Sequence, residues 1–118
     1  MSNSVKPYSN YVLKAIKNIK EDIACNPLRY KTASEILGRV NTPHRATVEK
    51  AFREIYKIGI KEYQVKKRLE ESKRFLEEGM TKKQVACKCF YRSQSSFAAA
   101  FKKEFKMTPS EWQLSYVG

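Results

Sequence analysis

Two stretches of this chain carry side chains that can hydrogen-bond to the edges of DNA bases. In the first, Arg45 suits a bidentate contact to guanine, Lys50 is a second guanine reader, and Glu49 could accept from cytosine or pair with a neighbouring arginine. In the second, Gln94 suits adenine, while Ala98 could pack on a thymine methyl group or simply favour the helix. The candidate base-reading residues are His44 (a DNA contact or a plain surface histidine), Arg45, Glu49, Lys50, Gln94, Ser95 and Ala98.

Basic residues around the second stretch could neutralise phosphate groups. From Met80 to Ser110 the sequence holds seven lysines and arginines and one acid, Glu104. The whole chain carries a formal charge of +12, which favours nucleic acid first and an acidic membrane surface second. Phosphate contacts set register and affinity without reading the sequence. The candidate phosphate-binding residues are Thr32, Arg53, Thr81, Lys82, Lys83, Arg92, Ser93, Lys102 and Lys103.

An internal repeat relates the two stretches. Residues 32–64 and 81–113 follow one pattern with an offset of 49 positions. A fixed period of this kind marks a duplicated supersecondary unit. The identical pairs are Thr32/Thr81, Ala51/Ala100, Phe52/Phe101, Glu62/Glu111 and Gln64/Gln113, and aromatic or charged character is kept at Tyr56/Phe105, Arg53/Lys102 and Tyr63/Trp112.

The elements that must position these residues are helices. Glycine and proline number four each, and apolar residues recur at three- and four-residue steps. A first helix is predicted over 9–24, with a buried stripe of Tyr8, Tyr11, Val12, Ala15, Ile16, Ile19 and Ile23. Capping boxes are predicted at Thr32/Glu35, Thr81/Gln84 and Thr108/Glu111, and Ser93 is a plausible helix cap.

Each repeat therefore reads as a short helix, a tight turn and a longer helix, which is a helix-turn-helix. The helices are predicted at 33–40 and 43–56 in the first copy and at 82–89 and 94–105 in the second. Asn41 suits a turn residue with positive φ, whereas Phe90, at the matching place, does not. We predict an all-α fold of two homeodomain-like three-helix units joined by a long linker helix, divided as 1–60, 61–79 and 80–118.

The linker helix is predicted over 61–78 and ends near Gly79. Its 18 positions would span about 27 Å. Adjacent major grooves on one face of B-DNA lie about 34 Å apart. A rod of this length could hold two recognition helices in neighbouring grooves.

Several other functions find no support in the sequence. Cys87 and Cys89 lack a further Cys or His at zinc-ligand spacing, so a redox pair at these two positions is a minor alternative and no metal is expected. One histidine and no suggestive pair of carboxylates leave no catalytic constellation, so we expect no enzyme and no cofactor. No apolar run approaches the ~18 residues needed to cross a bilayer, and residues 1–7 lack a signal-peptide core. We therefore expect a cytoplasmic protein without membrane association and without a small-molecule ligand in this chain.

The second half of the chain resembles a known family. The quoted residues are Arg68-Leu69, Gly79-Met80-Thr81, Val85-Ala86, Ser93-Gln94-Ser95-Ser96-Phe97, Phe101-Lys102-Lys103-Glu104-Phe105 and Thr108-Pro109-Ser110-Glu111-Trp112. Together they are similar to the DNA-binding domain of the AraC/XylS family of bacterial transcription regulators, and the resemblance extends over about 14–116. It implies binding to double-stranded promoter DNA as a pseudo-symmetric monomer and recruitment of RNA polymerase.

The sequence departs from that family at a few positions. Members usually have glycine where Phe90 and Lys106 stand, alanine where Leu37 stands, and often a large or charged residue where Ala99 stands. These departures concern the base contacts of the second unit and support one alternative, a helical protein-interaction module without specific DNA binding. Members usually also carry a sensing or dimerisation domain, so the chain is expected to be either a single-domain regulator or a fragment of a longer protein.

Overall fold

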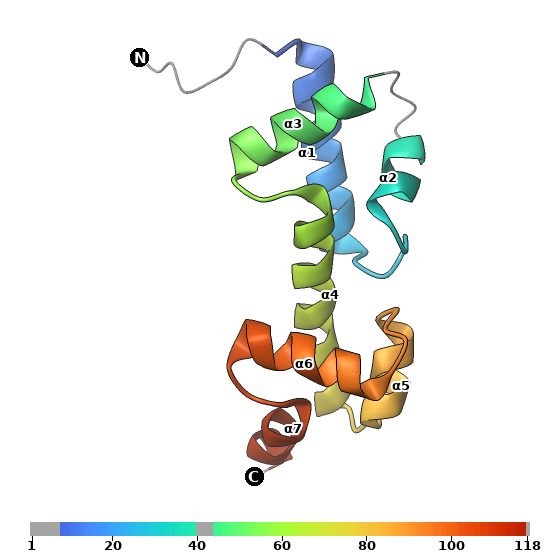
Figure 1. Cartoon of the computed structure of the whole chain (residues 1–118), viewed down its shortest axis with the longest axis vertical. Coiled ribbons are helices and arrows are strands. Elements are labelled where there is room, and N and C mark those ends of the chain that lie inside the picture. Colours follow the sequence, from blue (N-terminus) through green and yellow to red (C-terminus); the bar gives the residue numbers. More distant parts are fainter. Residues whose placement is uncertain (1–7, 40–43, 118) are drawn as a thin grey trace. The chain divides into compact units, whose positions relative to one another are not determined.

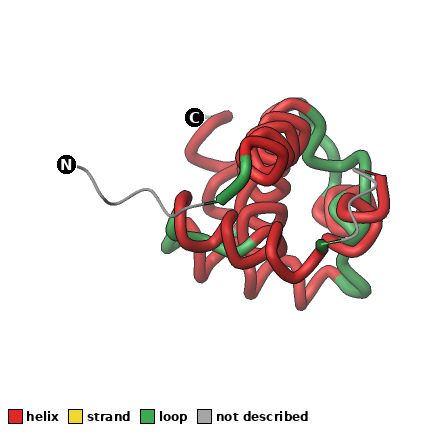
Figure 2. Tube along the Cα trace, turned by 90° about the horizontal axis from the view of Figure 1, so that it is seen from above, coloured by secondary structure: helices red, strands yellow, loops and turns green. Residues whose placement is uncertain are grey.

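The computed structural model describes residues 8–39 and 44–117, and within them every regular element is a helix (Figures 1 and 2). The all-α prediction is confirmed. The predicted turn residue Asn41 and the predicted helix start at Thr42 and Pro43 lie outside the described residues. The helices are α1 (Asn10–Cys25), α2 (Ala33–Arg39), α3 (Arg45–Tyr56), α4 (Ile60–Glu77), α5 (Lys82–Lys88), α6 (Gln94–Phe105) and α7 (Pro109–Val117).

The chain divides into two compact units between Val65 and Lys66, inside α4. Unit 1 contains α1, α2, α3 and the start of α4, and unit 2 contains the rest of α4 with α5, α6 and α7. Each unit has a helix-turn-helix, α2–α3 in the first and α5–α6 in the second. One continuous helix, α4, contributes residues to both.

The core of unit 1 forms where α1 packs against α3. Phe52 and Val48 of α3 are fully buried, and the Phe52 ring makes an edge contact with Tyr56 at 4.9 Å between centroids. Five predicted stripe residues of α1 are buried: Val12, Ala15, Ile16, Ile19 and Ile23. The prediction was wrong for Tyr11, which is 51% exposed, because it lies about 100° around the helix from Val12 and so falls off the inward face.

The core of unit 2 is an aromatic row along α6. Phe97 and Phe101 are fully buried, with ring centroids 5.8 Å apart. Phe101 also contacts Phe105 at 4.7 Å. Buried side chains of α4 and α5 complete this core, chiefly Leu69, Leu76 and Val85. Full burial of each such side chain stabilises the unit by about 1.5–3 kcal/mol.

The helix starts carry the predicted caps. Thr81 and Gln84 exchange hydrogen bonds of 3.0 and 3.1 Å in a capping box at the start of α5. The same reciprocal pair occurs at Thr32/Glu35 (2.9 and 3.1 Å) and at Thr108/Glu111 (2.8 and 3.1 Å). Acceptance of the Thr108 backbone N–H lowers the pKa of the Glu111 carboxyl. The three predicted capping boxes are therefore confirmed.

The matched glutamines of the repeat perform one task in both units. The side-chain amide of Gln64 donates to the Tyr30 carbonyl at 3.1 Å, and that of Gln113 donates to the Met80 carbonyl at 3.2 Å and the Leu76 carbonyl at 2.8 Å. Tyr30 and Met80 lie just before the capping threonines. Each glutamine thus fixes the entry into the first helix of its helix-turn-helix.

Phe90 adopts the left-handed conformation that its side chain disfavours. Its φ is +68° in the turn between α5 and α6, where the related family usually has glycine. A left-handed residue other than glycine costs about 1–2 kcal/mol. The Arg68 guanidinium lies 4.8 Å from the centre of the Phe90 ring, and this cation–π contact offsets part of the cost.

Replacing Gln64 by methionine should lower the free energy of unfolding by about 1–2 kcal/mol. Gln64 is 2% exposed, so the variant keeps the packing volume and loses the hydrogen bond to the Tyr30 carbonyl. Urea unfolding followed by circular dichroism measures the change. Gln94→Met is the matched control, because Gln94 is exposed at the start of α6, and it should leave the urea midpoint unchanged. Equal midpoints for both variants would contradict the role given to Gln64.

Candidate nucleic-acid interface

The outer face of α3 gathers the base-reading candidates of unit 1. The inner face of the helix is fixed by buried Val48, Ala51 and Phe52. The side chains predicted to read bases therefore point to solvent, and His44 directly precedes the helix. The exposed residues of this face are His44, Arg45, Ala46, Glu49, Lys50 and Arg53.

Arg45 is already engaged within the protein. One guanidinium nitrogen donates to the Ser34 carbonyl at 2.7 Å and lies 2.9 Å from the Ser34 hydroxyl. This contact ties the start of α3 to the first turn of α2. A bidentate contact to guanine would require Arg45 to exchange Ser34 for the base. Sequence reasoning missed this contact, because the two residues are eleven positions apart and belong to different helices.

Arg53 also has an acidic neighbour. Its guanidinium lies 3.5 Å from the Glu62 carboxylate, with both side chains about two-thirds exposed. Glu62 accepts the backbone N–H of Gly59 at 3.2 Å, in the place that Glu111 has in the second repeat. A side chain at Gly59 would meet the Arg53 guanidinium at 2.6 Å. The chain therefore leaves room for Arg53 to lie over the start of α4, and an exposed pair of this kind holds it only weakly.

The outer face of α6 is smaller and less polar than that of α3. Gln94, Ser95 and Ala99 are exposed, and Ala98 is half-buried beside the Phe97 and Phe101 face. The structure thus places Gln94 and Ser95 together at the solvent-facing start of α6. Ala98 offers only a methyl group there.

The three predicted hydroxyl contacts to phosphate already serve as helix caps. The Ser93 hydroxyl accepts the Ser96 backbone N–H at 3.1 Å. Thr32 and Thr81 use both the hydroxyl and the backbone N–H in their capping boxes. A phosphate at either threonine would have to share these groups or open the box.

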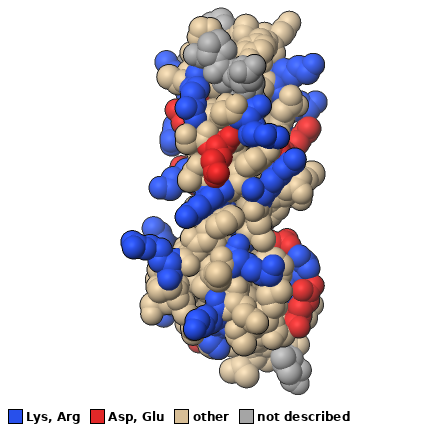
Figure 3. All heavy atoms as spheres, turned by 90° about the vertical axis from the view of Figure 1, so that its right-hand side faces the viewer, with Lys and Arg blue, Asp and Glu red and all other residues tan. Residues whose placement is uncertain are grey.

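The five predicted phosphate-binding lysines and arginines of unit 2 lie mostly at its surface. Lys83, Arg92, Lys102 and Lys103 are exposed and Lys82 is half-buried. Among the described residues, Lys82, Lys83 and Arg92 form no ion pair. Glu71 of α4 and Glu78, directly after that helix, both pair with Arg74. Figure 3 shows basic side chains spread over one face of each unit, with acidic groups of unit 2 gathered at an edge.

The described residues contain neither a metal-binding cluster nor a membrane-spanning helix. No cluster of three His, Cys, Asp or Glu residues in 8–39 and 44–117 could hold a metal ion. None of the described helices combines the length and the apolar character that a bilayer crossing needs.

Comparison with known proteins supports this interpretation. The family described as "Helix-turn-helix domain" matches residues 42–115, which is more than half of the chain. The structure of the C-terminal domain of AraT, a response regulator from Geobacillus stearothermophilus, is similar with a TM-score of 0.69. That match covers 93% of this chain and 88% of the other at 18% identity, so it shows the fold alone. No curated protein matches the chain.

The cysteines differ in exposure, which bears on the redox alternative. Cys25 and Cys87 are exposed and Cys89 is buried, with its sulfur 3.8 Å from the Arg68 carbonyl oxygen. Burial raises the pKa of the Cys89 thiol to about 11. A buried thiol with a raised pKa is a poor partner for disulfide exchange.

Thiol labelling should therefore separate Cys89 from the other two cysteines. In native protein, at a pH near the ordinary thiol pKa of about 8.5, iodoacetamide should modify Cys25 and Cys87. Cys89 should react at least a hundredfold more slowly, on the order expected from its smaller thiolate fraction. Peptide mass spectrometry distinguishes the sites, and all three should react in urea. Fast native labelling of Cys89 would show that it is accessible after all.

Proposed function

This chain belongs to the AraC-type family of helix-turn-helix DNA-binding domains of transcription regulators, and from that premise we propose that it binds specific sequences in double-stranded promoter DNA through α3 and α6. The family is one of DNA-binding domains and not of enzymes. The observation that carries the proposal is the polar and basic outer face of α3, which is opposite a fully buried Phe52. In a helix-turn-helix this second helix enters the major groove.

The binding mode that we propose uses two adjacent major grooves. The start of each second helix would meet base edges in its own groove. The 18 residues of α4 span about 27 Å, comparable to the ~34 Å repeat of B-DNA. Its length therefore supports a spacer role for α4. We propose three functional parts. Residues 1–60 hold the N-terminal helix and the first helix-turn-helix, residues 61–79 form the linker helix, and residues 80–118 hold the second helix-turn-helix.

The two recognition helices would divide the work. On α3, Arg45 and Lys50 would donate to guanine, and Glu49 would accept from cytosine or orient an arginine. On α6, Gln94 and Ser95 would make fewer base contacts, because the neighbouring alanines cannot hydrogen-bond. Phosphates would be bound in unit 2 by Lys82, Lys83, Arg92, Lys102 and Lys103. The first unit would thus read sequence and the second would mainly clamp the backbone.

Two further parts of the proposal concern the protein partner and the cellular compartment. A transcription regulator that binds promoter DNA acts beside RNA polymerase, so we propose the polymerase as a protein partner. DNA in a bacterial cell lies in the cytoplasm, where we place the protein.

Arg45→Ala should relax specificity at one base pair and cost about 1–3 kcal/mol of binding free energy on the preferred duplex. The preferred duplex comes from selection out of a random pool, and fluorescence anisotropy then compares it with its single-base variants. Ser34→Ala is the matched control, because it removes one partner of Arg45 without removing the guanidinium. It should keep the base preference. An equal loss on every duplex for Arg45→Ala would remove Arg45 from base reading.

Lys102→Ala and Lys103→Ala should weaken all duplexes alike. Each substitution that removes a phosphate-binding charge should reduce the slope of log K against log salt by about 1. For the parent chain, about 6–10 such charges at phosphates would reduce affinity by roughly 10³–10⁵ between 50 and 200 mM salt. Affinity for mixed-sequence duplex DNA across a salt series gives both numbers. A flat salt dependence would favour the protein-interaction alternative.

A further inference from the structure

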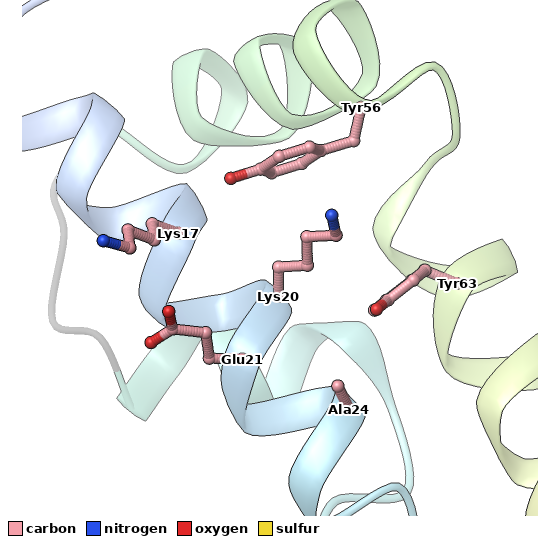
Figure 4. A pocket seen from close by; sticks show the side chains of 6 residues that line it. All are labelled: Lys17, Lys20, Glu21, Ala24, Tyr56 and Tyr63. Atoms are coloured by element: carbon pink, nitrogen blue, oxygen red, sulfur yellow. The ribbon is translucent and has the colours of Figure 1, made fainter.

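Both units place a lysine against aromatic rings at matched positions of the repeat, over one ring in unit 1 and over two in unit 2. In unit 1 the Lys20 ammonium nitrogen lies 4.4 Å from the centre of the Tyr56 ring, beside Tyr63 (Figure 4). In unit 2 the Lys73 nitrogen lies 3.8 Å from Phe105 and 4.5 Å from Trp112. Tyr56 matches Phe105 and Tyr63 matches Trp112 in the repeat. The lysine–aromatic contact is therefore a feature common to the two units.

The two units differ in what surrounds this contact. Unit 2 has the large indole of Trp112, whose ring nitrogen is buried without a hydrogen-bond partner among the described residues. Unit 1 has the smaller ring of Tyr63 at the matching position, and a hollow of about 470 Å³ opens beside Tyr63 and Tyr56. Its walls come from α1, the end of α3 and the start of α4 (Figure 4). The lining residues are Lys17, Lys20, Glu21, Ala24, Tyr56 and Tyr63.

The hollow combines positive charge with flat apolar walls. Lys17 and Lys20 are three positions apart and so lie on one face of α1. Tyr56 and Tyr63 bring phenol rings and hydroxyl groups, and Ala24 leaves the floor open (Figure 4). Burial and the Glu21 carboxylate raise the pKa of Tyr56. A phenol hydroxyl can donate a hydrogen bond to an anion. Two cations against one acid, Glu21, leave the hollow net positive.

We propose that this hollow binds a small organic anion with a planar apolar body. Its carboxylate would pair with the Lys20 ammonium group near the tyrosine hydroxyls, and its planar body would lie against the phenol rings above Ala24. Charge-assisted hydrogen bonds and ring contacts are the interactions that fix such ligands in pockets.

The ligand site is separate from the proposed DNA contacts. None of its six lining residues belongs to the candidate base-reading or phosphate-binding residues. The sequence led us to expect no small-molecule ligand in this chain. That expectation arose because the lining residues are spread over three helices between positions 17 and 63, with no recognisable motif.

The test is a titration of the ¹⁵N-labelled full chain with phenylacetate, with phenylacetamide and inorganic phosphate as parallel probes. Phenylacetate should shift backbone signals around 17–24, 56 and 63 in a saturable way, with a Kd of roughly 1 mM. Phenylacetamide has the ring without the charge, and phosphate has the charge without the ring. Both should bind at least tenfold more weakly. Equal binding of either probe, or no saturable shift with phenylacetate, would overturn the proposal.

Variants then locate the site. Lys20→Met removes the ammonium group and keeps a long side chain, and it should weaken phenylacetate binding about tenfold. Tyr63→Trp introduces the residue that unit 2 has at the matched position, and it should block the hollow while retaining the aromatic wall. Lys14→Met, at an exposed position of α1 outside the hollow, is the charge-matched control and should bind as the parent does. Unchanged affinity in both test variants, with a native spectrum, would exclude this site.

Discussion

The burial of one phenylalanine in each second helix, Phe52 in α3 and Phe101 in α6, is the constraint on which the surface of this protein depends. Both rings are fully buried and both belong to the identical positions of the repeat. Once that side of the helix is turned inward, the 3.6-residue period decides which side chains face solvent. The polar residues of α3 are presented outward for this reason, and so are the small residues of α6.

The repeat has kept its internal contacts and changed its surfaces. Gln64 and Gln113 each bind a carbonyl group shortly before a capping threonine, and capping boxes begin α2 and α5. These contacts define a helix-turn-helix whatever it binds. The outer faces of α3 and α6 make none of these internal contacts, so their residues can differ. The face of α3 presents arginine, glutamate and lysine, and the face of α6 presents glutamine, serine and alanine. Different surfaces on one scaffold support the proposed division between reading sequence and binding backbone.

Several groups that suit DNA are already used by the fold. The threonine hydroxyls cap helices and the Arg45 guanidinium binds Ser34. An interface made in this way exchanges internal hydrogen bonds for external ones, so each contact contributes less than its geometry alone suggests. Lys82, Lys83 and Arg92 carry no such cost, because they form no ion pair within 8–39 and 44–117. This difference supports the proposal that affinity depends mainly on the second unit and specificity on the first.

The sequence by itself determined the helices, their caps, the repeat and the basic excess, because these depend on residues three or four positions apart or on simple composition. The tertiary structure alone decided the engagement of Arg45 by Ser34, the outward position of Tyr11, the cation–π contact at left-handed Phe90 and the hollow beside Lys20. Three of these depend on residues that lie far apart in the chain and meet only when helices pack. Tyr11 shows the same limit, since a periodic pattern gives the direction of a stripe but only the packed neighbours decide where its edge falls.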